Sequence, residues 1–224
     1  MTSLTIEQKR VDIYPSAKPG SPVIYLNTFS NAVNSVYKNL MALGCPDFSL
    51  VAVSKLKWDH DMTPWYMGPI SKHDTPCTGG ADDYLKLLLD EIMPEAEALL
   101  PGAPAWRGLA GYSLAGLFAL WASTQTDLFY GVAAASPSVW FPGWMEFEQQ
   151  HPIQAQHVYL SLGDKEERTK NAVMAAVGDN IRTLHSRLIE RGADCTLEWN
   201  SGGHFKDADL RTAKAFRWTM EESR

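Results

Sequence analysis

The chain has 224 residues, a formal net charge of −6 and 45% hydrophobic residues. These values are typical of a globular protein, and the length allows a single domain over residues 1–224 with a sizeable core. The mildly acidic balance, with no lysine or arginine cluster, argues against nucleic-acid binding. No apolar run reaches the roughly 18 residues that a membrane span requires.

Residues 1–20 carry charges where the apolar core of a signal peptide would lie. Cys45, Cys77 and Cys195 are odd in number and form no CxxC pair, so reduced, mostly buried thiols are expected. Together these features predict a cytoplasmic protein.

Short apolar runs alternate with longer amphipathic stretches along nearly the whole chain. The first run, 4–15, predicts an edge strand that turns at Pro19-Gly20. Buried strands are expected at 21–29, 48–54, 105–112, 130–136, 156–163 and 194–199, and helices at 34–43, 81–100, 114–124, 172–192 and 208–222. Pro94 should kink or divide the second helix, and Gly192 should cap the fourth. The alternation predicts an α/β fold, with a mostly parallel central sheet and helices on both faces.

In such a sheet ligands bind beyond the carboxyl ends of the strands. There the sequence GYSLA, residues 111–115, joins a predicted strand to a helix and differs by one methyl group from the GxSxG nucleophile elbow. The elbow would lift the Ser113 hydroxyl above the sheet and turn the Leu114 N–H toward a developing oxyanion. The alternative is that Ser113 is one small residue of a packed helix, because such a pentapeptide arises by chance in roughly one chain of seven or eight of this length.

A serine nucleophile needs a base, and His204 lies in the glycine-bounded loop after the last predicted strand. This position fits the chain order serine, acid, histidine of the α/β-hydrolase architecture. The other histidines are expected to be surface or structural residues; they are His60, His73, His151, His157 and His185.

The acid that orients His204 is expected after the strand 156–163, where Asp164, Glu166 and Glu167 follow Gly163. Glu166 is the first candidate, because the acid of related hydrolases often lies three positions after the loop glycine. Asp164 is the alternative acid, and bracing the turn is its alternative role. The same acidic run also fits a solvated helix start with Asp164 as its N-cap. A second oxyanion donor is expected from the backbone of Thr28 or Phe29, which follow the first central strand.

Several segments in order resemble the Putative esterase (esterase D-like) family of α/β-hydrolases, in particular the branch of siderophore (enterochelin-type) esterases. They are DMTPW (61–65), GGADDYLKLLLDEIMP (79–94), AGYSLAGLFAL (110–120), ASPSVWFPGW (135–144), LSLGDKEE (160–167) and SGGHF (201–205). The resemblance implies an α/β-hydrolase fold and serine-dependent ester hydrolysis through an acyl-enzyme, with Ser113 and His204 catalytic and Leu114 an oxyanion donor. Two features depart from the pattern: Ala115 replaces the usual glycine, and the extra N-terminal domain of the larger siderophore esterases is not expected. The short connection after ASPSVW leaves no room for a lid domain, so an open cleft is expected.

Aromatic side chains gather in the two segments expected to flank Ser113. Trp58, Trp65, Tyr66, Trp140, Phe141 and Trp144, together with Tyr112, form the predicted substrate-binding set. They suit a flat or aryl acyl group, although covering the core and the cleft edge would explain them equally well. Asp59, His60 and Asp61 are too close in sequence to form a closed metal site, so no metal or other cofactor is expected.

The leading interpretation is therefore a carboxylic-ester hydrolase that acts on a small-molecule ester. An acyltransferase using the same site is the first alternative. A non-catalytic binding module on a hydrolase scaffold is the second, since fold alone does not guarantee activity. Oligomeric state is not predicted.

Overall fold

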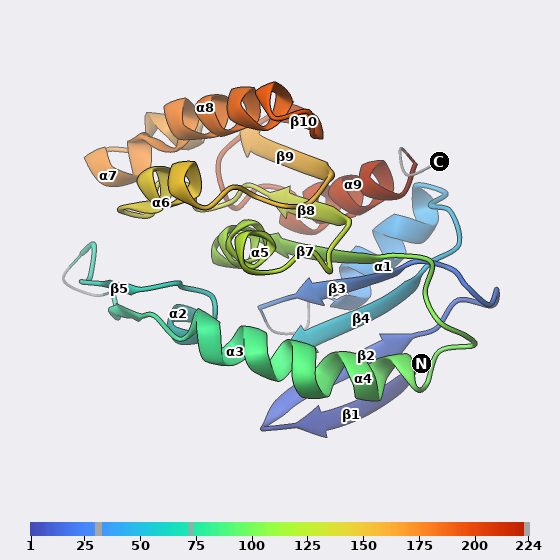
Figure 1. Cartoon of the computed structure of the whole chain (residues 1–224). Coiled ribbons are helices and arrows are strands. Elements are labelled where there is room, and N and C mark those ends of the chain that lie inside the picture. The colour runs from blue at the N-terminus through green and yellow to red at the C-terminus, as the bar shows by residue number, and fades with distance from the viewer. Residues whose placement is uncertain (30–32, 72–73, 222–224) are drawn as a thin grey trace.

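The computed structural model describes residues 1–29, 33–71 and 74–221, and within them an eight-stranded sheet forms the centre of the molecule (Figure 1). The strand order is β1-β2-β4-β3-β7-β8-β9-β10. The strands are β1 (Thr2–Ile6), β2 (Lys9–Tyr14), β3 (Val23–Asn27), β4 (Ser49–Ser54), β7 (Arg107–Tyr112), β8 (Gly131–Ala135), β9 (His157–Gly163) and β10 (Asp194–Asn200). All pairs from β4 to β10 are parallel, whereas β1–β2 and β2–β4 are antiparallel. The predicted α/β fold is confirmed.

Helices cover both faces of this sheet (Figure 1). One face carries α1 (Val33–Ala42) and α9 (Ala208–Glu221). The other carries α3 (Ala81–Leu87), α5 (Leu114–Gln125) and α8 (Val177–Glu190). Strands covered on both faces have no solvent side, and every residue of β3, β8 and β9 is buried.

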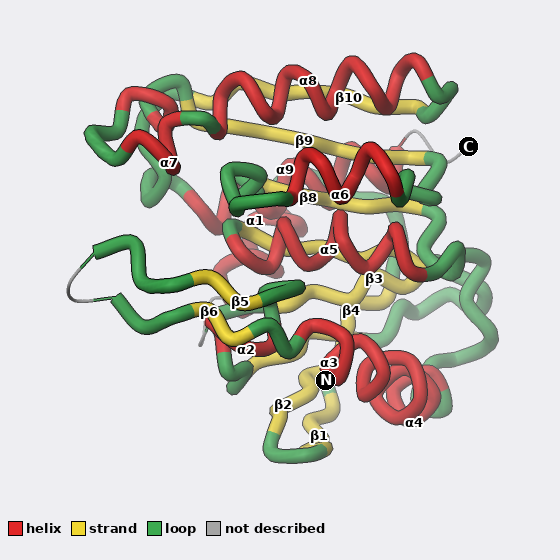
Figure 2. The backbone as a smooth tube through the Cα atoms, turned by 60° about the vertical axis from the view of Figure 1, so that its left-hand side comes forward, coloured by secondary structure: helices red, strands yellow, loops and turns green. Residues whose placement is uncertain are grey.

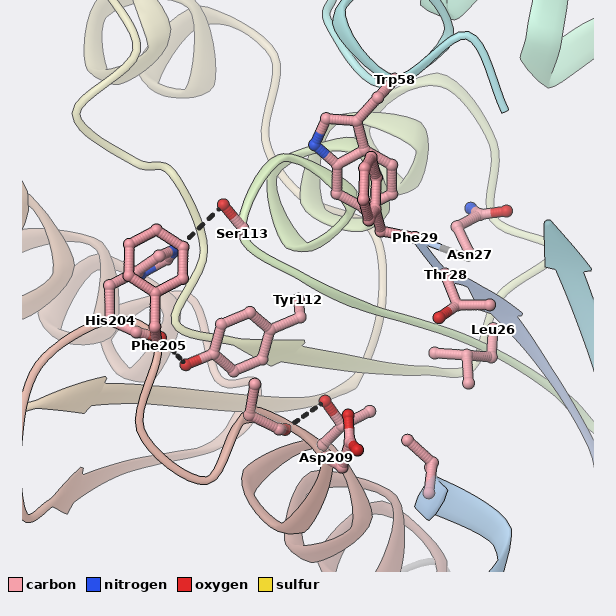
Figure 3. Close-up of a pocket in the computed structure, with 13 residues that line it drawn as sticks. Leu26, Asn27, Thr28, Phe29, Trp58, Tyr112, Ser113, His204, Phe205 and Asp209 are labelled. Atoms are coloured by element: carbon pink, nitrogen blue, oxygen red, sulfur yellow. Dashed lines mark hydrogen bonds between the residues drawn. The ribbon is translucent and has the colours of Figure 1, made fainter. Parts of the chain in front are cut away.

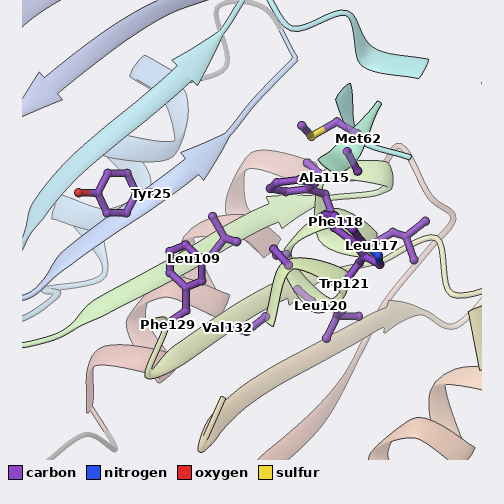
Figure 4. Packing of buried hydrophobic residues seen from close by; sticks show 14 of the residues in the cluster. Tyr25, Met62, Leu109, Ala115, Leu117, Phe118, Leu120, Trp121, Phe129 and Val132 are labelled. Carbon is purple, nitrogen blue, oxygen red and sulfur yellow. The ribbon is translucent and has the colours of Figure 1, made fainter. Parts of the chain in front are cut away.

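The two faces bury separate hydrophobic clusters, and the alternation along each strand divides the side chains between them. In β3, Tyr25 packs into the cluster under α3 and α5, whereas Ile24 and Leu26 pack under α1 and α9. Helix α5 lies on the same face as α3 and α8 and buries every residue from Leu114 to Ser123, as expected for a helix that is apolar all round (Figure 4). This central helix begins immediately after Ser113.

The N-terminal run differs from its prediction, which is wrong in expecting one strand over 4–15. The run folds into a hairpin in which β1 and β2 are joined by Glu7 and Gln8, both with positive φ, 45° and 66°. Two-residue turns of this type usually contain Asn or Gly. Because Glu-Gln carries no such signal, the sequence did not reveal the turn.

The expected division of the second helix takes the form of a change in hydrogen bonding. Helix α3 continues into a π-helical turn, η2 (Leu88–Ile92), and then into α4 (Met93–Glu97), where Pro94 lies in the first turn. A missing N–H is tolerated at that position. The fourth predicted helix is split into α7 (Ala172–Ala175) and α8, and Gly192, with φ of 85°, closes it as predicted by donating its N–H to Ile189 O over 2.9 Å.

Two excursions leave the sheet at the carboxyl ends of its parallel strands. The first follows β4 and contains α2 (Trp58–Asp61), β5 (Tyr66–Met67) and β6 (Cys77–Thr78), the last two paired as a small ribbon that projects beyond the sheet (Figure 2). The second, between β8 and β9, contains α6 (Trp144–Gln150). The indole N–H of Trp65 joins them by donating to Pro142 O over 2.8 Å. A short 3-10 helix, η3 (Glu166–Arg168), follows β9.

A buried ion pair fixes the first excursion to the N-terminal hairpin. The ammonium of Lys9 on β2 contacts the Asp61 carboxylate on α2, and the two side chains are only 8% and 7% exposed. Asp61 also accepts the Lys57 N–H over 2.7 Å. Among the described helices, none combines the length and the apolar character that crossing a bilayer demands.

We predict that Lys9→Met destabilises the protein by about 3 to 5 kcal/mol, because the Asp61 carboxylate would stay buried without its partner. The free energy of unfolding from urea titration measures this loss. The double variant Lys9→Met/Asp61→Asn should recover much of it, since no unpaired charge then remains. Equal destabilisation of the single and double variants would contradict this account.

Candidate active site

Ser113 occupies a sharp turn between β7 and α5. Its backbone has φ of 61° and ψ of −123°, a region that residues with a side chain rarely adopt. Two backbone hydrogen bonds to the end of β8 and the residues after it hold the turn. The Ser113 N–H donates to Ala135 O over 3.2 Å, and the Ser138 N–H donates to Ser113 O over 3.1 Å. The turn places the Ser113 hydroxyl at the carboxyl edge of the sheet, beside the N-terminus of α5.

The turn requires that strand and helix nearly touch. A Cβ atom added to Gly111 would lie 2.3 Å from the carbonyl carbon of Ala115 and 2.6 Å from its Cβ. No side chain fits at residue 111, whereas the methyl group of Ala115 is accommodated and fully buried. The departure from the family glycine at residue 115 is therefore compatible with the elbow.

A chain of hydrogen bonds joins three side chains at this edge. The Ser113 Oγ lies 3.0 Å from His204 Nε2 (Figure 3), and His204 Nδ1 lies 2.7 Å from Glu166 Oε2. A carboxylate can only accept, so Nδ1 carries the proton and Nε2 is left to accept from the serine hydroxyl. The structure thus brings together Ser113, His204 and Glu166.

Glu166 is held by donors on both oxygens. Besides His204 on Oε2, its Oε1 accepts from the Gly163 N–H at 2.7 Å, the Ser136 hydroxyl at 2.9 Å and Arg211 Nη1 at 3.1 Å. Burial alone raises the pKa of this carboxyl, but His204 and the Gly163 and Ser136 donors outweigh it, so the pKa of Glu166 lies below its ordinary value. The carboxylate is therefore ionised when it faces the imidazole.

Arg211 is the residue at this site that sequence reasoning missed. It belongs to α9, is only 2% exposed, and contacts the Tyr112 hydroxyl at 3.2 Å in addition to Glu166. It lies on the same helical face as Ala215 and Thr219, both buried. An arginine on the apolar face of an amphipathic helix indicates a buried carboxylate partner, and that was the available signal.

The other acids of the loop have different partners. Asp164 Oδ1 accepts the Gly202 N–H over 2.7 Å, and its own N–H donates to Asn200 O over 2.8 Å, so it braces the loop that leads to His204. Glu167 pairs with Arg182 at 2.9 Å. Of the three candidates only Glu166 contacts His204.

Of the backbone groups expected to donate to an oxyanion, Leu114 and Phe29 remain candidates, whereas the sheet uses Thr28. The Leu114 N–H is the first of α5 and has no intrahelical acceptor. The Thr28 N–H donates to Val53 O over 3.0 Å, so the expectation that Thr28 donates to an oxyanion is wrong: parallel pairing with β4 extends one residue beyond β3 and uses this group. Phe29 follows it and lines the cavity next to Ser113.

A cavity of about 390 Å³, hereafter the large cavity, opens beside Ser113 (Figure 3). Its lining is mostly apolar and comes from the ends of β3 and β7, from α1 and from the start of α9; it includes Leu26, Phe29, Val36, Trp58, Tyr112, Ser113, His204, Phe205, Asp209 and Thr212. Trp58 packs edge to face on Phe29, with ring centroids 5.4 Å apart. Trp58 and Tyr112, two of the predicted substrate-binding residues, thus line the cavity, and Tyr112 also holds the loop by donating its hydroxyl to His204 O over 2.7 Å.

A second cavity of about 230 Å³, hereafter the small cavity, lies on the other side of His204 and Phe205, which line both. Trp140, a third predicted residue, lines it. Phe205 is 94% exposed and stands between the two cavities. It was not predicted, although it belongs to the SGGHF motif.

The remaining predicted aromatic residues lie elsewhere. Trp144 and Phe141 are buried in the core, so the expectation that Trp144 contacts a ligand is wrong. Trp65 packs on Phe141, with centroids 5.9 Å apart, and Tyr66 is 68% exposed on the projecting ribbon. Neither lines the large or the small cavity. Aromatic residues that lie close together in the sequence can belong either to the core or to a cleft. Their grouping does not distinguish the two, because aromatic side chains cover apolar surface in both places.

The Asp59, His60 and Asp61 side chains have separate partners. Asp59 accepts from Thr75, His60 Nδ1 lies 2.7 Å from Thr78 Oγ1, and Asp61 pairs with Lys9. Among the described residues, no cluster of His, Cys, Asp and Glu side chains has the arrangement needed to hold a metal ion.

The three cysteines are free thiols. Burial raises the pKa of Cys77 to about 11 and that of Cys45 and Cys195 to about 12, so all three stay protonated near neutral pH. None of them lines the large or the small cavity.

Residues 27–206 match the family described as Putative esterase. The chain belongs to this family. Among curated proteins, the ferri-bacillibactin esterase BesA of Bacillus subtilis is 26% identical over 188 residues, which are 78% of this chain and 60% of BesA. The chain therefore spans less than two thirds of that relative.

Two solved structures show the same fold. The siderophore hydrolase EstA of Aspergillus nidulans superposes with a TM-score of 0.71 at 18% identity, over 96% of this chain and 91% of EstA. An IroE-like serine hydrolase of Shewanella oneidensis superposes with a TM-score of 0.77 at 17% identity, over 96% of this chain and 78% of that one. The predicted family resemblance is confirmed.

We predict that Gly111→Ala lowers stability by at least about 2 kcal/mol, because its Cβ would overlap the backbone of Ala115 and move the helix start. Chemical denaturation measures the loss. Gly102→Ala is the matched control, since the nearest atom to its Cβ would be 3.5 Å away, at ordinary contact distance. A Gly111→Ala protein as stable as the Gly102→Ala protein would show that the elbow does not depend on this close approach.

Proposed function

We propose that the protein is a serine-dependent carboxylic-ester hydrolase that acts through an acyl-enzyme. The observation that carries the proposal is the hydrogen-bonded series of Ser113, His204 and Glu166, with the serine on a turn of positive φ at the start of α5. Membership of an esterase family supports ester hydrolysis as the reaction.

In the proposed mechanism the Ser113 Oγ attacks the ester carbonyl carbon while its proton passes to His204 Nε2. The carbonyl oxygen becomes an oxyanion that accepts hydrogen bonds from the N–H groups of Leu114 and Phe29. Glu166 fixes the imidazole and stabilises its charged form. The alkoxide then leaves with the proton from Nε2, and the acyl group stays on Ser113. Water, deprotonated by His204, attacks the acyl-enzyme; the Ser113 Oγ leaves with the proton from Nε2, and the carboxylic acid is released.

The large cavity suits an apolar, flat acyl group. Phe29 and Trp58 form one aromatic side of its mouth, and Phe205 stands on the other. Aromatic faces at these positions bind planar groups by stacking and edge contacts. The relatives named as a ferri-bacillibactin esterase and a siderophore hydrolase make siderophore esters one class of small-molecule ester to be tested.

Hydrolysis is favoured over acyl transfer because water reaches the site. Phe205 next to His204 is 94% exposed, and the His204 side chain itself is 26% exposed. An acyltransferase must keep water from its acyl-enzyme, which an open site does poorly.

The first test is covalent labelling by a fluorophosphonate probe. The wild-type protein should gain the mass of one phosphonyl group on Ser113, and Ser113→Ala should gain none. The variant should also lose at least about 10³-fold in kcat/KM on 4-nitrophenyl butyrate. Ser138→Ala is the matched control, because its hydroxyl lies 3.4 Å from Ser113 Oγ yet has no role in the mechanism. Equal labelling of wild type and Ser113→Ala would refute the proposal.

The second test separates the two candidate acids. Glu166→Gln should lower kcat/KM by about 10²- to 10⁴-fold, because an amide does not stabilise the imidazolium. Asp164→Asn should cost far less, since Asp164 braces the loop without touching His204. Comparable losses for both variants would count against the assignment of Glu166.

The lowered pKa of Glu166 also predicts a pH dependence of stability. A carboxyl whose pKa falls on folding contributes stability above its unfolded value, and that contribution disappears as pH falls through the folded value. The difference in the free energy of unfolding between wild type and Glu166→Gln should therefore be constant above the ordinary value near 4.5 and shrink below it. Thermal denaturation of both proteins at pH values from roughly 3 to 7 measures this difference.

A further inference from the structure

The small cavity adjoins the large one on the His204 side of the reacting atoms. His204 and Phe205 line both cavities, whereas Ser113 lines the large cavity alone. Phe29, the proposed second oxyanion donor, also lines the large cavity and not the small one. We therefore place the carbonyl group of the ester, with its acyl chain, on the side of the large cavity.

The group next to His204 in the tetrahedral intermediate is the leaving alcohol, because it takes its proton from Nε2. An alcohol that extends beyond the His204 ring enters the small cavity. This step rests on the proposed ester hydrolysis at Ser113.

The small cavity has an apolar wall and a cationic edge. Pro137, Trp140, Met174 and Val177 supply the wall. Lys165 and Glu166 line the edge, and the Lys165 backbone is fixed by the hydrogen bond of its N–H to Gly202 O at 3.2 Å. Among the described residues, no carboxylate forms an ion pair with the Lys165 ammonium, because neighbouring Glu166 is occupied by His204 and Arg211, and Glu167 by Arg182.

The large cavity carries the opposite charge. Asp209 in the first turn of α9 lines it, and no described residue forms a hydrogen bond or ion pair with its carboxylate. An anionic group on the substrate is therefore repelled on the acyl side and attracted on the alcohol side, and this fixes the direction in which an ester binds.

We propose that the small cavity is the binding site for the alcohol half of the substrate, and that Lys165 makes it selective for an alcohol with an apolar body and an anionic group. The selected ester has an uncharged acyl group in the large cavity and an acidic, ring-bearing alcohol in the small cavity. When the ester bond breaks, the leaving alkoxide takes its proton from His204 Nε2, and the alcohol with its anionic group departs past Lys165.

The test uses two esters with the same acyl group and leaving phenols of similar acidity: 3-carboxyphenyl butyrate, which is anionic, and 3-carbamoylphenyl butyrate, which is neutral. Wild type should favour the anionic ester by roughly threefold to tenfold in kcat/KM, the scale of one partly exposed charge pair. Lys165→Met should remove this preference and leave kcat/KM for the neutral ester within about twofold. Added NaCl should weaken the preference of the wild type.

Lys38→Met is the matched control. It removes the same charge from the exposed side of α1, outside both cavities, and should keep the wild-type preference. A second pair places the charge on the acyl half, monophenyl succinate and phenyl succinamate, and Lys165→Met should leave the ratio of these two unchanged.

A size test addresses the cavity itself. Met174→Trp fills it from α7 and should raise KM for both aryl esters while sparing methyl butyrate, whose alcohol does not reach the cavity.

The outcomes separate this inference from the proposed function. A wild-type enzyme that hydrolyses both aryl esters without charge preference, or a preference that persists in Lys165→Met, overturns the inference and leaves the esterase intact. Absence of hydrolysis of every ester, with no labelling of Ser113, overturns the proposed function and this inference with it.

Discussion

A buried carboxylate, that of Glu166, joins four parts of the molecule at the carboxyl edge of the sheet. Its donors come from the end of β9, the residue after β8, helix α9 and the loop that carries His204. Each donor lowers the cost of burying the charge, and each is fixed in place by the charge in return. The position of the imidazole is thus set by the packing of the sheet rather than by the loop alone.

The turn at Ser113 fixes the position of the hydroxyl group that contacts the other side of the imidazole. Its backbone conformation is unfavourable for a serine, and it persists because β8 and the residues after it hold the turn through two backbone hydrogen bonds. Helix α5, buried on all sides, cannot shift to relieve the turn. Rigid elements therefore place the hydroxyl and the imidazole within 3.0 Å of each other.

The His204–Phe205 dipeptide divides the surroundings of Ser113 into two cavities of different size, lining and charge. The division follows from topology. The large cavity lies where β3, β7 and the first turns of α1 and α9 meet, whereas the small cavity lies between the loops after β8 and β9. Under the proposed function, a substrate bound across His204 and Phe205 would present its ester bond to Ser113, with one half in each cavity.

The sequence determined the fold class, the order of buried strands and the positions of Ser113 and His204, because hydrophobic periodicity and glycine-bounded strand ends are local signals. It also confined the candidate acid to residues 164–167 and favoured Glu166, the carboxylate that contacts His204 in the structure. It missed the hairpin at Glu7-Gln8, whose turn lacks the usual residues. The sequence left Asp164 as an alternative to Glu166. The two carboxylates are distinguished only by their contacts with residues distant in sequence.

Only the tertiary structure decided the remaining points. In the folded protein Asp164 accepts a hydrogen bond from the Gly202 N–H, and the Thr28 N–H is paired within the sheet. Trp144 is buried, and Arg211 of the last helix contacts Glu166. The reason is the same in each case. Local sequence fixes which segments are strands and helices, but the partners of a polar group or an aromatic ring come from segments far away in the chain, and only packing brings them together.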